Sequence, residues 1–281
     1  MRGNPYGISH AEKSIVSQII HPAAIVSKHA EIGRDVEIGP YCMVDEHVKI
    51  GDGCRLISHV VISGHTTIGP DNRIFPFVSI GHEPQDLKYH GEPSEVVIGS
   101  GNTIRENVTI NPGTEGGGML TRIGDNNLLM AYSHVAHDCL LGSGIIMANA
   151  VTLAGHVVVD DGAIVGGMSA IHQFIRIGRY SMIGGMSGVV KDIPPYCLTA
   201  GGYRPGLAGL NVVGLRRHGF SNERIRMLKE IYRILLQGSG KMDERMREAE
   251  SAAGDDADAL HLIEFVRTAE RGMTTHRRDT Q

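Results

Sequence analysis

An apolar residue recurs at every sixth position along most of this 281-residue chain, and no other feature constrains the fold as strongly. Three short strands of about six residues each complete one coil of a parallel β-helix, which is the structure typical of this period. We therefore expect coils of about 18 residues, stacked at the strand spacing of about 4.8 Å. The series runs through Ile20, Val26, Ile32, Ile38, Val44, Ile50, Leu56, Ile62, Ile68, Ile74 and Ile80, then Ile98, Ile104 and Ile110, and then Ile123, Leu129, Val135, Leu141, Met147, Leu153, Val159, Val165, Ile171, Ile177, Ile183 and Val189.

Small residues accompany the repeat. Glycine often follows the apolar residue, as at Gly51 and Gly69, where a corner has no room for a Cβ atom. The position two before each apolar residue should also point inward, because side chains alternate along a strand. Three of the four cysteines are therefore expected to fill the interior, and the absence of CxxC spacing favours a reducing compartment. These inward positions hold Cys42, Cys54, Ser133, Cys139, Ala163 and Ser169.

Two segments interrupt the repeat, at 81–97 and 111–122. Inserted loops on a regular scaffold commonly carry function, so both are candidates for the binding of substrates. The separation of Ile80 and Ile98 equals the length of one coil, which predicts that the first interruption replaces one whole coil in phase.

The repeat ends near residue 190, and helical patterns follow a linker rich in glycine and proline. We expect helices to begin near Asn211 and after Ser221, a favourable N-cap, and to span about 241–252 and 257–271. Their apolar stripes hold Ile225, Leu228, Ile231, Tyr232 and Leu235, then Met242, Met246 and Ala249, then Leu260, Ile263 and Val266. The expected organisation is an N-terminal extension (1–19), a β-helix (20–196), and a linker with a small α-helical domain (197–281).

The composition excludes several classes of protein. With 41% hydrophobic and 21% charged residues, no tryptophan and a net charge of −4, it gives no reason to expect nucleic acid as a partner. No apolar run approaches the roughly 18 residues of a membrane-spanning helix. The segment 1–12 is too polar for a signal peptide. We therefore expect a cytoplasmic protein without an integral membrane segment.

Acid–base groups are concentrated at 132–156. His134, His137 and Asp138 lie close together in the sequence, and His156 follows His137 by about one coil, which places it near the same corner. Histidine accepts and releases protons near neutral pH, so this cluster is the candidate catalytic site.

Five motifs, together with the repeat, resemble the UDP-N-acetylglucosamine O-acyltransferase family. They are QDLKY at 85–89, AHD at 136–138, LAGH at 153–156, IHQF at 171–174 and GLRRHGF at 214–220. The resemblance covers the chain from about His21 onward. It implies a mainly β protein with a left-handed parallel β-helix and a small α-helical C-terminal domain. It further implies a homotrimer whose active sites lie in clefts between neighbouring subunits.

The resemblance also implies a reaction, the transfer of a 3-hydroxyacyl group from acyl carrier protein to the 3-hydroxyl of UDP-N-acetylglucosamine, the first step of lipid A biosynthesis. His137 corresponds to the general base, Asp138 to its partner, and the Gly155 N–H to the donor that stabilises the oxyanion. Val213 stands where the family often has an acidic residue, which leaves the contacts around the nucleotide open. The implied substrate-binding residues are Gln85, Asp86, Lys88, His134, His156, His172, Gln173, Gly185, Asn211, Arg216 and Arg217.

Other functions remain open from the residues alone. In a γ-carbonic anhydrase-like trimer, His134, His137 and His156 would bind zinc, but the two loops and the helical C-terminus would then have no role. The related N-acyltransferase of the same pathway carries an additional N-terminal sugar-binding domain, which we do not expect here. A solenoid that serves only as a scaffold would not require the acid–base cluster. We expect neither a metal nor another cofactor.

Two further expectations concern the acyl donor. The segment 191–236 carries eight Lys or Arg residues against three Asp or Glu, so Arg204 to Arg233 should attract an acidic acyl carrier protein. Gly185 should lie about 13 Å beyond His137 along the coil axis, at about 4.8 Å for each coil. A glycine there leaves space for an acyl chain of about 12 to 14 carbons.

Overall fold

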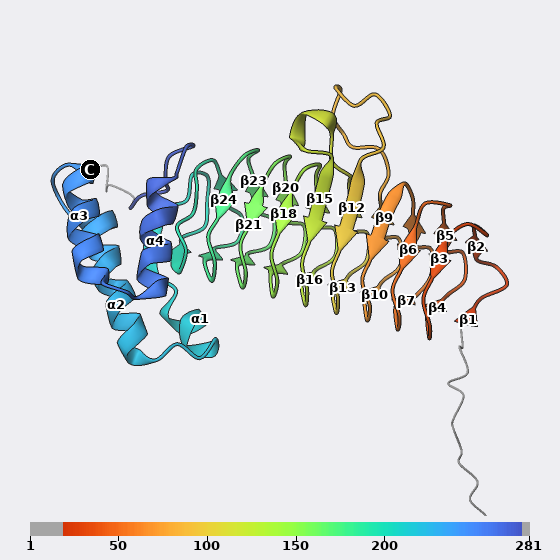
Figure 1. The fold of residues 1–281 in the computed structure, drawn as a ribbon, viewed down its shortest axis with the longest axis horizontal. Helices are drawn as coiled ribbons and strands as arrows, with labels where there is room; N and C mark the ends of the chain where they lie inside the picture. Colours follow the sequence, from red (N-terminus) through yellow and green to blue (C-terminus); the bar gives the residue numbers. More distant parts are fainter. Residues whose placement is uncertain (1–18, 277–281) are drawn as a thin grey trace, which may run out of the picture.

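The computed structural model describes residues 19–276, which form a solenoid of short strands followed by a group of helices (Figure 1). The N-terminal extension expected at 1–19 lies outside the described residues, except for Ile19. Each coil contributes one strand to each of three sheets, here called A, B and C, and the chain passes from A to B to C. We name the corners between them the A–B, B–C and C–A corners.

The strands are mostly two residues long and pair in parallel, apart from the last two of sheet A. Sheet A contains β1 (Ile19–Ile20), β4 (Glu37–Ile38), β7 (Arg55–Leu56), β10 (Arg73–Ile74), β13 (Thr103–Ile104), β16 (Leu128–Leu129), β19 (Ile146–Met147), β22 (Ile164–Val165), β25 (Met182–Ile183), β27 (Cys197–Thr199) and β28 (Leu207–Leu210). Sheet B contains β2 (Ile25–Val26), β5 (Met43–Val44), β8 (Val61–Ile62), β11 (Ser79–Ile80), β14 (Thr109–Ile110), β17 (His134–Val135), β20 (Thr152–Leu153), β23 (Ala170–Ile171) and β26 (Gly188–Val189). Sheet C contains β3 (Glu31–Ile32), β6 (Lys49–Ile50), β9 (His65–Ile68), β12 (Glu95–Ile98), β15 (Leu120–Ile123), β18 (Leu140–Leu141), β21 (Val158–Val159) and β24 (Arg176–Ile177).

The pairing confirms the predicted coil length, since Ile20 pairs with Ile38 and Leu129 with Met147. Every member of the apolar series from Ile38 to Val189 is buried and lines one continuous core. Ile20 is 41% exposed, because the first described coil is stacked on one side only.

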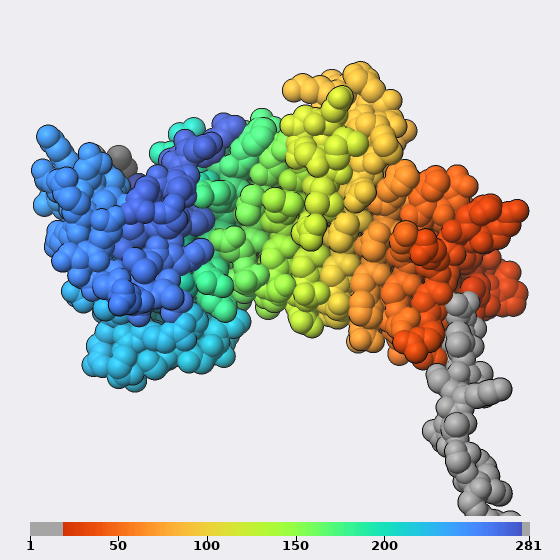
Figure 2. Space-filling view, in the orientation of Figure 1, coloured from red at the N-terminus to blue at the C-terminus, as the bar shows by residue number. Residues whose placement is uncertain are grey.

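The predicted phase of the first interruption was wrong. Ile98 pairs with Ile68 and lies in sheet C, whereas Ile80 lies in sheet B. The loop therefore leaves the coil after β11 and returns at the same B–C corner, so its residues are added to a coil rather than replacing one. The second loop likewise leaves after β14, and Ile110 still pairs with Val135 of the next coil. Both loops project from one edge of the solenoid (Figures 1 and 2), because a chain that leaves and returns at one corner does not disturb the stacking.

The inward positions hold the small residues that the alternation predicts, and all six are buried. Three further inward positions hold asparagines, a feature that the sequence analysis missed. Asn72, Asn102 and Asn127 form a ladder in which the Oδ1 of each accepts a backbone N–H from the next coil. The Nδ2 of each donates to a glycine carbonyl of the next coil, so these buried amides are satisfied.

The corners repeat one backbone conformation, in which the residue three positions after the apolar marker has a positive φ. At the C–A corner the glycines stack directly, and a Cβ on Gly51 would lie 2.7 Å from the carbonyl carbon of Gly69. At the A–B corner the positive-φ residues include exposed apolar side chains, which we call the apolar column. Its members are Tyr41, Phe77, Tyr132, Met168 and Met186.

Helices complete the C-terminal end of the solenoid (Figure 1). They are α1 (Val212–Arg217), α2 (Asn222–Tyr232) with a π-helical extension (Arg233–Gln237), α3 (Met242–Ala253) and α4 (Ala257–Arg267). Ser221 caps α2 as predicted, because its hydroxyl accepts a hydrogen bond from the Arg224 N–H. Met242 and Leu260, expected on apolar stripes, are exposed; Met242 begins α3, and Leu260 lies beside the buried face formed by Ala259, Leu262 and Ile263.

The helices join the solenoid through a second apolar cluster that includes the buried Tyr196. Arg176 links the two parts, since its guanidinium donates to Asp192 and to the Phe265 carbonyl. Among residues 19–276, no helix has the length and apolar character that spanning a bilayer would need.

Candidate active site

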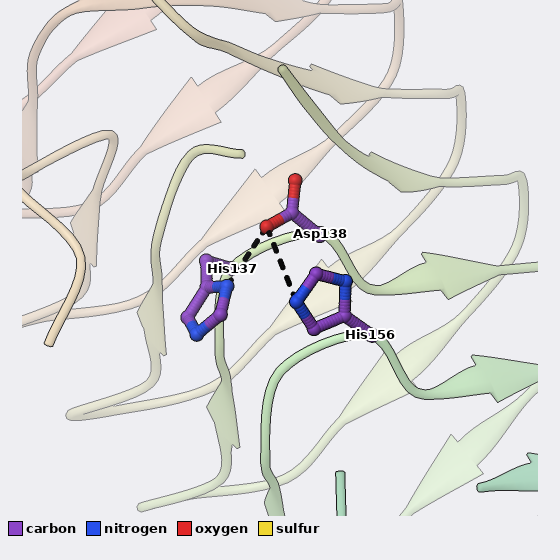
Figure 3. Close-up of side chains that lie close together, drawn as sticks. All are labelled: His137, Asp138 and His156. Atoms are coloured by element: carbon purple, nitrogen blue, oxygen red, sulfur yellow. Dashed lines mark hydrogen bonds and ion pairs between the residues drawn. The ribbon is translucent and has the colours of Figure 1, made fainter. Parts of the chain in front are cut away.

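His137 and Asp138 follow β17 at the B–C corner, where the backbone turns with a φ of 59° at Asp138. His137 Nδ1 lies 2.8 Å from Asp138 Oδ2, and the carboxylate is buried (Figure 3). An ionised carboxylate can accept hydrogen bonds but cannot donate them. The proton of the neutral imidazole therefore sits on Nδ1, which faces Asp138. The lone pair of His137 then lies on Nε2 and is available to a substrate.

The second loop fixes the carboxylate of Asp138. The Thr114 N–H donates to Oδ1 at 2.9 Å, and the Thr114 hydroxyl donates to Oδ2 at 2.6 Å. Thr121 Oγ1 accepts the Asp138 N–H at 2.8 Å, and a Cβ on Gly117 would overlap the carboxyl group. Sequence analysis missed these three residues. The loop was recognised as an interruption, but the residues that would face the aspartate depend on how the loop folds back.

Gly155 lies against the His137 ring one coil further on. A Cβ at this position would overlap the ring at Cε1 and Nε2, so only glycine lets the ring lie here. Within residues 19–276 the Gly155 N–H donates no hydrogen bond to another group. Gly155 therefore places an unused backbone donor close to the histidine.

Aromatic rings continue the site along the corner. The rings of His137 and His156 meet edge to face with centroids 5.1 Å apart, and His156 stacks on Phe174 at 4.3 Å. Burial lowers the pKa of His156 below its ordinary value, although Asp138 opposes that shift. Burial also lowers the pKa of His134, and His137 adds to the effect. Both imidazoles are therefore neutral near pH 7, which suits hydrogen bonding to uncharged hydroxyl groups.

The first loop approaches the reactive nitrogen from outside. Asp86 Oδ2 lies 3.9 Å from His137 Nε2, while Lys88 is exposed and close enough to help lower the pKa of His156. Glu92 joins the two loops, because its carboxylate accepts the Glu115 N–H. Gln85 is exposed on the same loop. The first loop thus places an acidic side chain, Asp86, beside His137 and a basic one, Lys88, near His156.

The remaining predicted residues fall into two groups. His134 lies on β17, and its Nδ1 is hydrogen-bonded to Thr109 Oγ1 at 2.7 Å. His172 and Gln173 are exposed at the B–C corner after β23, two coils from His137. Residues 185, 211, 216 and 217 lie elsewhere, so a single chain does not bring them to the dyad.

Gly185 follows β25 at the A–B corner, next to Met186 of the apolar column. Asn211 is buried and caps α1 by accepting the Gly214 N–H. Arg216 and Arg217 are exposed at the end of that helix. Val213, the departure from the family pattern, is 63% exposed on the same helix.

The positions of the histidines bear on the zinc alternative. His137, Asp138 and His156 are the three residues of the described chain whose ligand atoms lie within 4.8 Å of one another. His134, which the zinc hypothesis required, does not belong to that group.

Burial raises the pKa of the Cys139 thiol to about 12, so this cysteine is no nucleophile near neutral pH.

Comparison with known proteins adds independent findings. Residues 192–274 match a family model described as UDP N-acetylglucosamine O-acyltransferase, domain 2, and residues 29–64 match the bacterial transferase hexapeptide (six repeats). The chain is 50% identical over 258 residues to an acyl-[acyl-carrier-protein]–UDP-N-acetylglucosamine O-acyltransferase of Paraburkholderia phymatum, covering 90% of this chain and 98% of the relative. A protein of the same name from Alkalilimnicola ehrlichii is 52% identical over 254 residues, with the same two coverages.

Solved structures agree with these relatives. A UDP-N-acetylglucosamine acyltransferase of Francisella novicida superposes with a TM-score of 0.88 at 37% identity, covering 92% of this chain and 95% of that one. The corresponding protein of Campylobacter jejuni gives 0.87 at 40% identity, covering 92% and 100%. The expected fold class, a left-handed parallel β-helix followed by C-terminal helices, is confirmed.

Proposed function

Because the chain belongs to the UDP-N-acetylglucosamine O-acyltransferase family, we propose that it transfers a 3-hydroxyacyl group from acyl carrier protein to the 3-hydroxyl of UDP-N-acetylglucosamine. The reaction is the first step of lipid A biosynthesis. The observation that carries the proposal is the His137–Asp138 dyad, set beside the N–H of Gly155, which donates no hydrogen bond within residues 19–276.

His137 acts as the general base. A sugar hydroxyl attacks a thioester only if its proton is removed as the new bond forms. The proton of the 3-hydroxyl moves to Nε2 while the oxygen bonds to the thioester carbon. Asp138 then stabilises the imidazolium through the 2.8 Å hydrogen bond to Nδ1.

Gly155 stabilises the negative charge of the tetrahedral intermediate. The charge develops on the former carbonyl oxygen, and a preorganised backbone N–H in a partly buried site offsets it without reorganisation. As the intermediate collapses, the carbon–sulfur bond breaks and the imidazolium returns its proton to the sulfur. His137 is thereby regenerated, and no cofactor takes part in this sequence.

The substrate contacts follow from position. Asp86 lies beside Nε2, and Gln85 and Lys88 belong to the same loop; together with His134 and His156 on the coils, these side chains suit the hydroxyl groups of a sugar. His172 and Gln173 continue the corner toward the acyl chain. Arg216 and Arg217 suit the phosphates of the nucleotide, because guanidinium groups bind such oxygens in two-pronged geometry.

We assign the enzyme to a homotrimer whose active sites combine two subunits. The apolar column presents Tyr132, Met168 and Met186 at 66 to 70% exposure along one edge, a pattern typical of an interface. Gly185 lies on that same edge, away from the dyad of its own chain. If the apolar column of one subunit faces the B–C corner of the next, Gly185 lies against the corner that carries His137.

A cytoplasmic location fits the substrates, since sugar nucleotides and acyl carriers are cytoplasmic. All four cysteines are free and buried, as expected in a reducing compartment.

Mass spectrometry of the product tests the function. The purified protein should convert UDP-N-acetylglucosamine and a ladder of 3-hydroxyacyl carrier thioesters into an O-acylated sugar nucleotide. If product forms only with a 3-amino sugar nucleotide, the acceptor is that analogue and not UDP-N-acetylglucosamine. The absence of any acylated product, with hydration of carbon dioxide instead, would support the zinc alternative.

A further inference from the structure

Asp138 carries a buried negative charge that no permanent cation neutralises. Its side chain is fully buried, and its ion-pair contacts are with His137 and His156. No lysine or arginine of residues 19–276 forms an ion pair with it. Buried charges in proteins are normally paired or bound to a metal ion. The carboxylate is therefore placed where a bound cation would stabilise it.

The three side chains present ligand atoms at separations suited to one small metal ion (Figure 3). His137 Nδ1 lies 2.8 Å from Asp138 Oδ2, and His156 Nε2 lies 3.9 Å from the same oxygen. Two ligands of a tetrahedral zinc ion are about 3.4 Å apart, given bonds of about 2.05 Å. The two observed distances lie on either side of that value, and all three ligand atoms lie within 4.8 Å of one another. Small rotations of the two rings would bring the three atoms to one ion.

Both imidazoles can offer a lone pair to a metal. Burial lowers the pKa of His156, so its ring is neutral near pH 7. Within residues 19–276 neither of its ring nitrogens is hydrogen-bonded. The neutral ring of His137 carries one proton, which can sit on either nitrogen. His137 Nδ1 becomes a ligand when this proton moves to Nε2.

The surroundings of the three ligands resemble those of a metal site. Thr114 fixes the carboxylate of Asp138 through its N–H and its hydroxyl, and hydrogen bonds of this kind orient the ligands of bound metals. Asp86 Oδ2 lies 3.9 Å from His137 Nε2, across the ring from Nδ1. A proton on Nε2 would therefore face a second carboxylate, which favours the tautomer that a metal at Nδ1 requires.

We propose that His137, Asp138 and His156 bind a divalent transition metal ion of the Zn²⁺ type, and that this ion inhibits the enzyme. The inhibitory role rests on the proposed acyl transfer. The ion takes the place of the proton between His137 and Asp138, and that proton moves to Nε2. The lone pair that would accept the proton of the sugar hydroxyl is then lost. Two imidazoles and one carboxylate suit zinc, whereas magnesium prefers oxygen ligands.

Another histidine–carboxylate pair provides a comparison within the molecule. His47 Nε2 lies 3.6 Å from Glu46 Oε1, where both side chains are exposed. Across residues 19–276, however, His137, Asp138 and His156 are the group that brings three ligand atoms within 4.8 Å. A site with three protein ligands is typical of bound zinc, so we expect the ion at the dyad and not at His47.

Isothermal titration of the full-length protein with zinc chloride tests the site directly. We expect one ion for each chain, with affinity at least tenfold weaker in His156→Asn and in Asp138→Asn. Asparagine is the chosen substitute because the two positions have φ angles of 62° and 59°, a conformation that it tolerates. His47→Ala is the matched control and should change the affinity less than twofold. Magnesium chloride should give no binding.

Two outcomes of the titration would contradict the proposal. Zinc affinity that stays unchanged in His156→Asn would overturn it, and this variant decides alone should Asp138→Asn unfold, since His156 is only partly buried. Asp86→Asn should weaken binding less than threefold. A larger loss in Asp86→Asn than in His156→Asn would place the ion at His137 Nε2 and overturn the assignment.

Kinetics test the inhibition. At a zinc concentration that saturates the site, kcat for acyl transfer should fall at least tenfold, and EDTA should restore it. Full activity of the zinc-bound protein would overturn the inhibitory role. Activity that requires zinc and is lost in EDTA would also overturn it, because the metal would then be a cofactor. If zinc binds as expected but no acyl transfer occurs with or without EDTA, the proposed function fails while the metal site stands.

Discussion

Two corners of the same β-helix share a backbone conformation and differ in almost everything else. Met168 at the A–B corner has a φ of 58°, and His156 at the B–C corner has a φ of 62°. At the A–B corner Met168 is 66% exposed, while at the B–C corner the second inserted loop covers Asp138, and His156 is partly buried. The repeating backbone therefore sets where side chains are placed, and the insertions create the environment in which they react.

His137→Ala measures the importance of the covered corner. We expect kcat to fall by about 10²- to 10⁴-fold, the usual contribution of a general base, with circular dichroism and oligomeric state unchanged. His47→Ala is the matched control, because His47 lies exposed at the same B–C corner where no loop covers it. Near-normal turnover of a folded His137→Ala protein would remove the residue from its assigned role.

Charges on the apolar column test whether the uncovered corner is an interface. Tyr132→Glu combined with Met168→Glu should dissociate the proposed trimer, because carboxylates would be buried without partners. Activity should fall at least tenfold as the shared sites are lost. Sedimentation velocity gives the mass of the assembly. Met242 is an exposed apolar residue of α3, so the control protein Met242→Glu should keep the mass of the unaltered protein. A double variant that sediments as a trimer would show that this corner is not the contact.

Thr114→Val tests how far the loop orders the dyad. Removing the hydroxyl leaves Asp138 Oδ2 with one donor fewer, at a cost of about 1.4 kcal/mol, so kcat should fall about tenfold with little change in either KM. Thr114→Ser keeps the donor and should restore most of the loss. Equal activity of the valine and serine variants would mean that the backbone N–H suffices.

Gly185→Met tests whether the acyl chain lies between the A–B corner of one subunit and the B–C corner of the next. A Cβ on Gly185 would be 3.2 Å from the Gly167 carbonyl oxygen, so a side chain fits after a small shift. A methionine about 5 Å long should shorten the preferred acyl chain by about four carbons, with Gly185→Ala intermediate. Relative kcat/KM over a ladder of donors gives the profile, and an unchanged optimum would leave the glycine with a purely structural role.

Much of the fold could be predicted from the sequence, because a period of six fixes both the strands and the inward positions. The loops were harder. Ile80 and Ile98 keep the period in number but occupy different sheets, since a loop of arbitrary length can conceal the true register. The asparagine ladder was missed because the amides are satisfied by neighbouring coils, which sequence spacing does not reveal.

The candidate site divides in the same way, into residues that the sequence predicts and residues that only the structure reveals. The cluster of His137, Asp138 and His156 could be predicted from spacing and chemistry, and the structure brings the three together. The role of Thr114 could not, since it depends on the path of an irregular loop. Gly185 and Asn211 could be named only from family resemblance, because a single chain holds them away from the dyad.

The asparagine ladder has a consequence for how the molecule opens. Repeat proteins are held largely by contacts between neighbours, so coils can in principle fray one at a time. Asn72, Asn102 and Asn127 link the successive coils from which both active-site loops emerge. Amide protons of these coils should therefore exchange with solvent as one cooperative block, more slowly than those of the coils near Ile25. The segment that has accepted two insertions would then be the last part of the solenoid to lose protection.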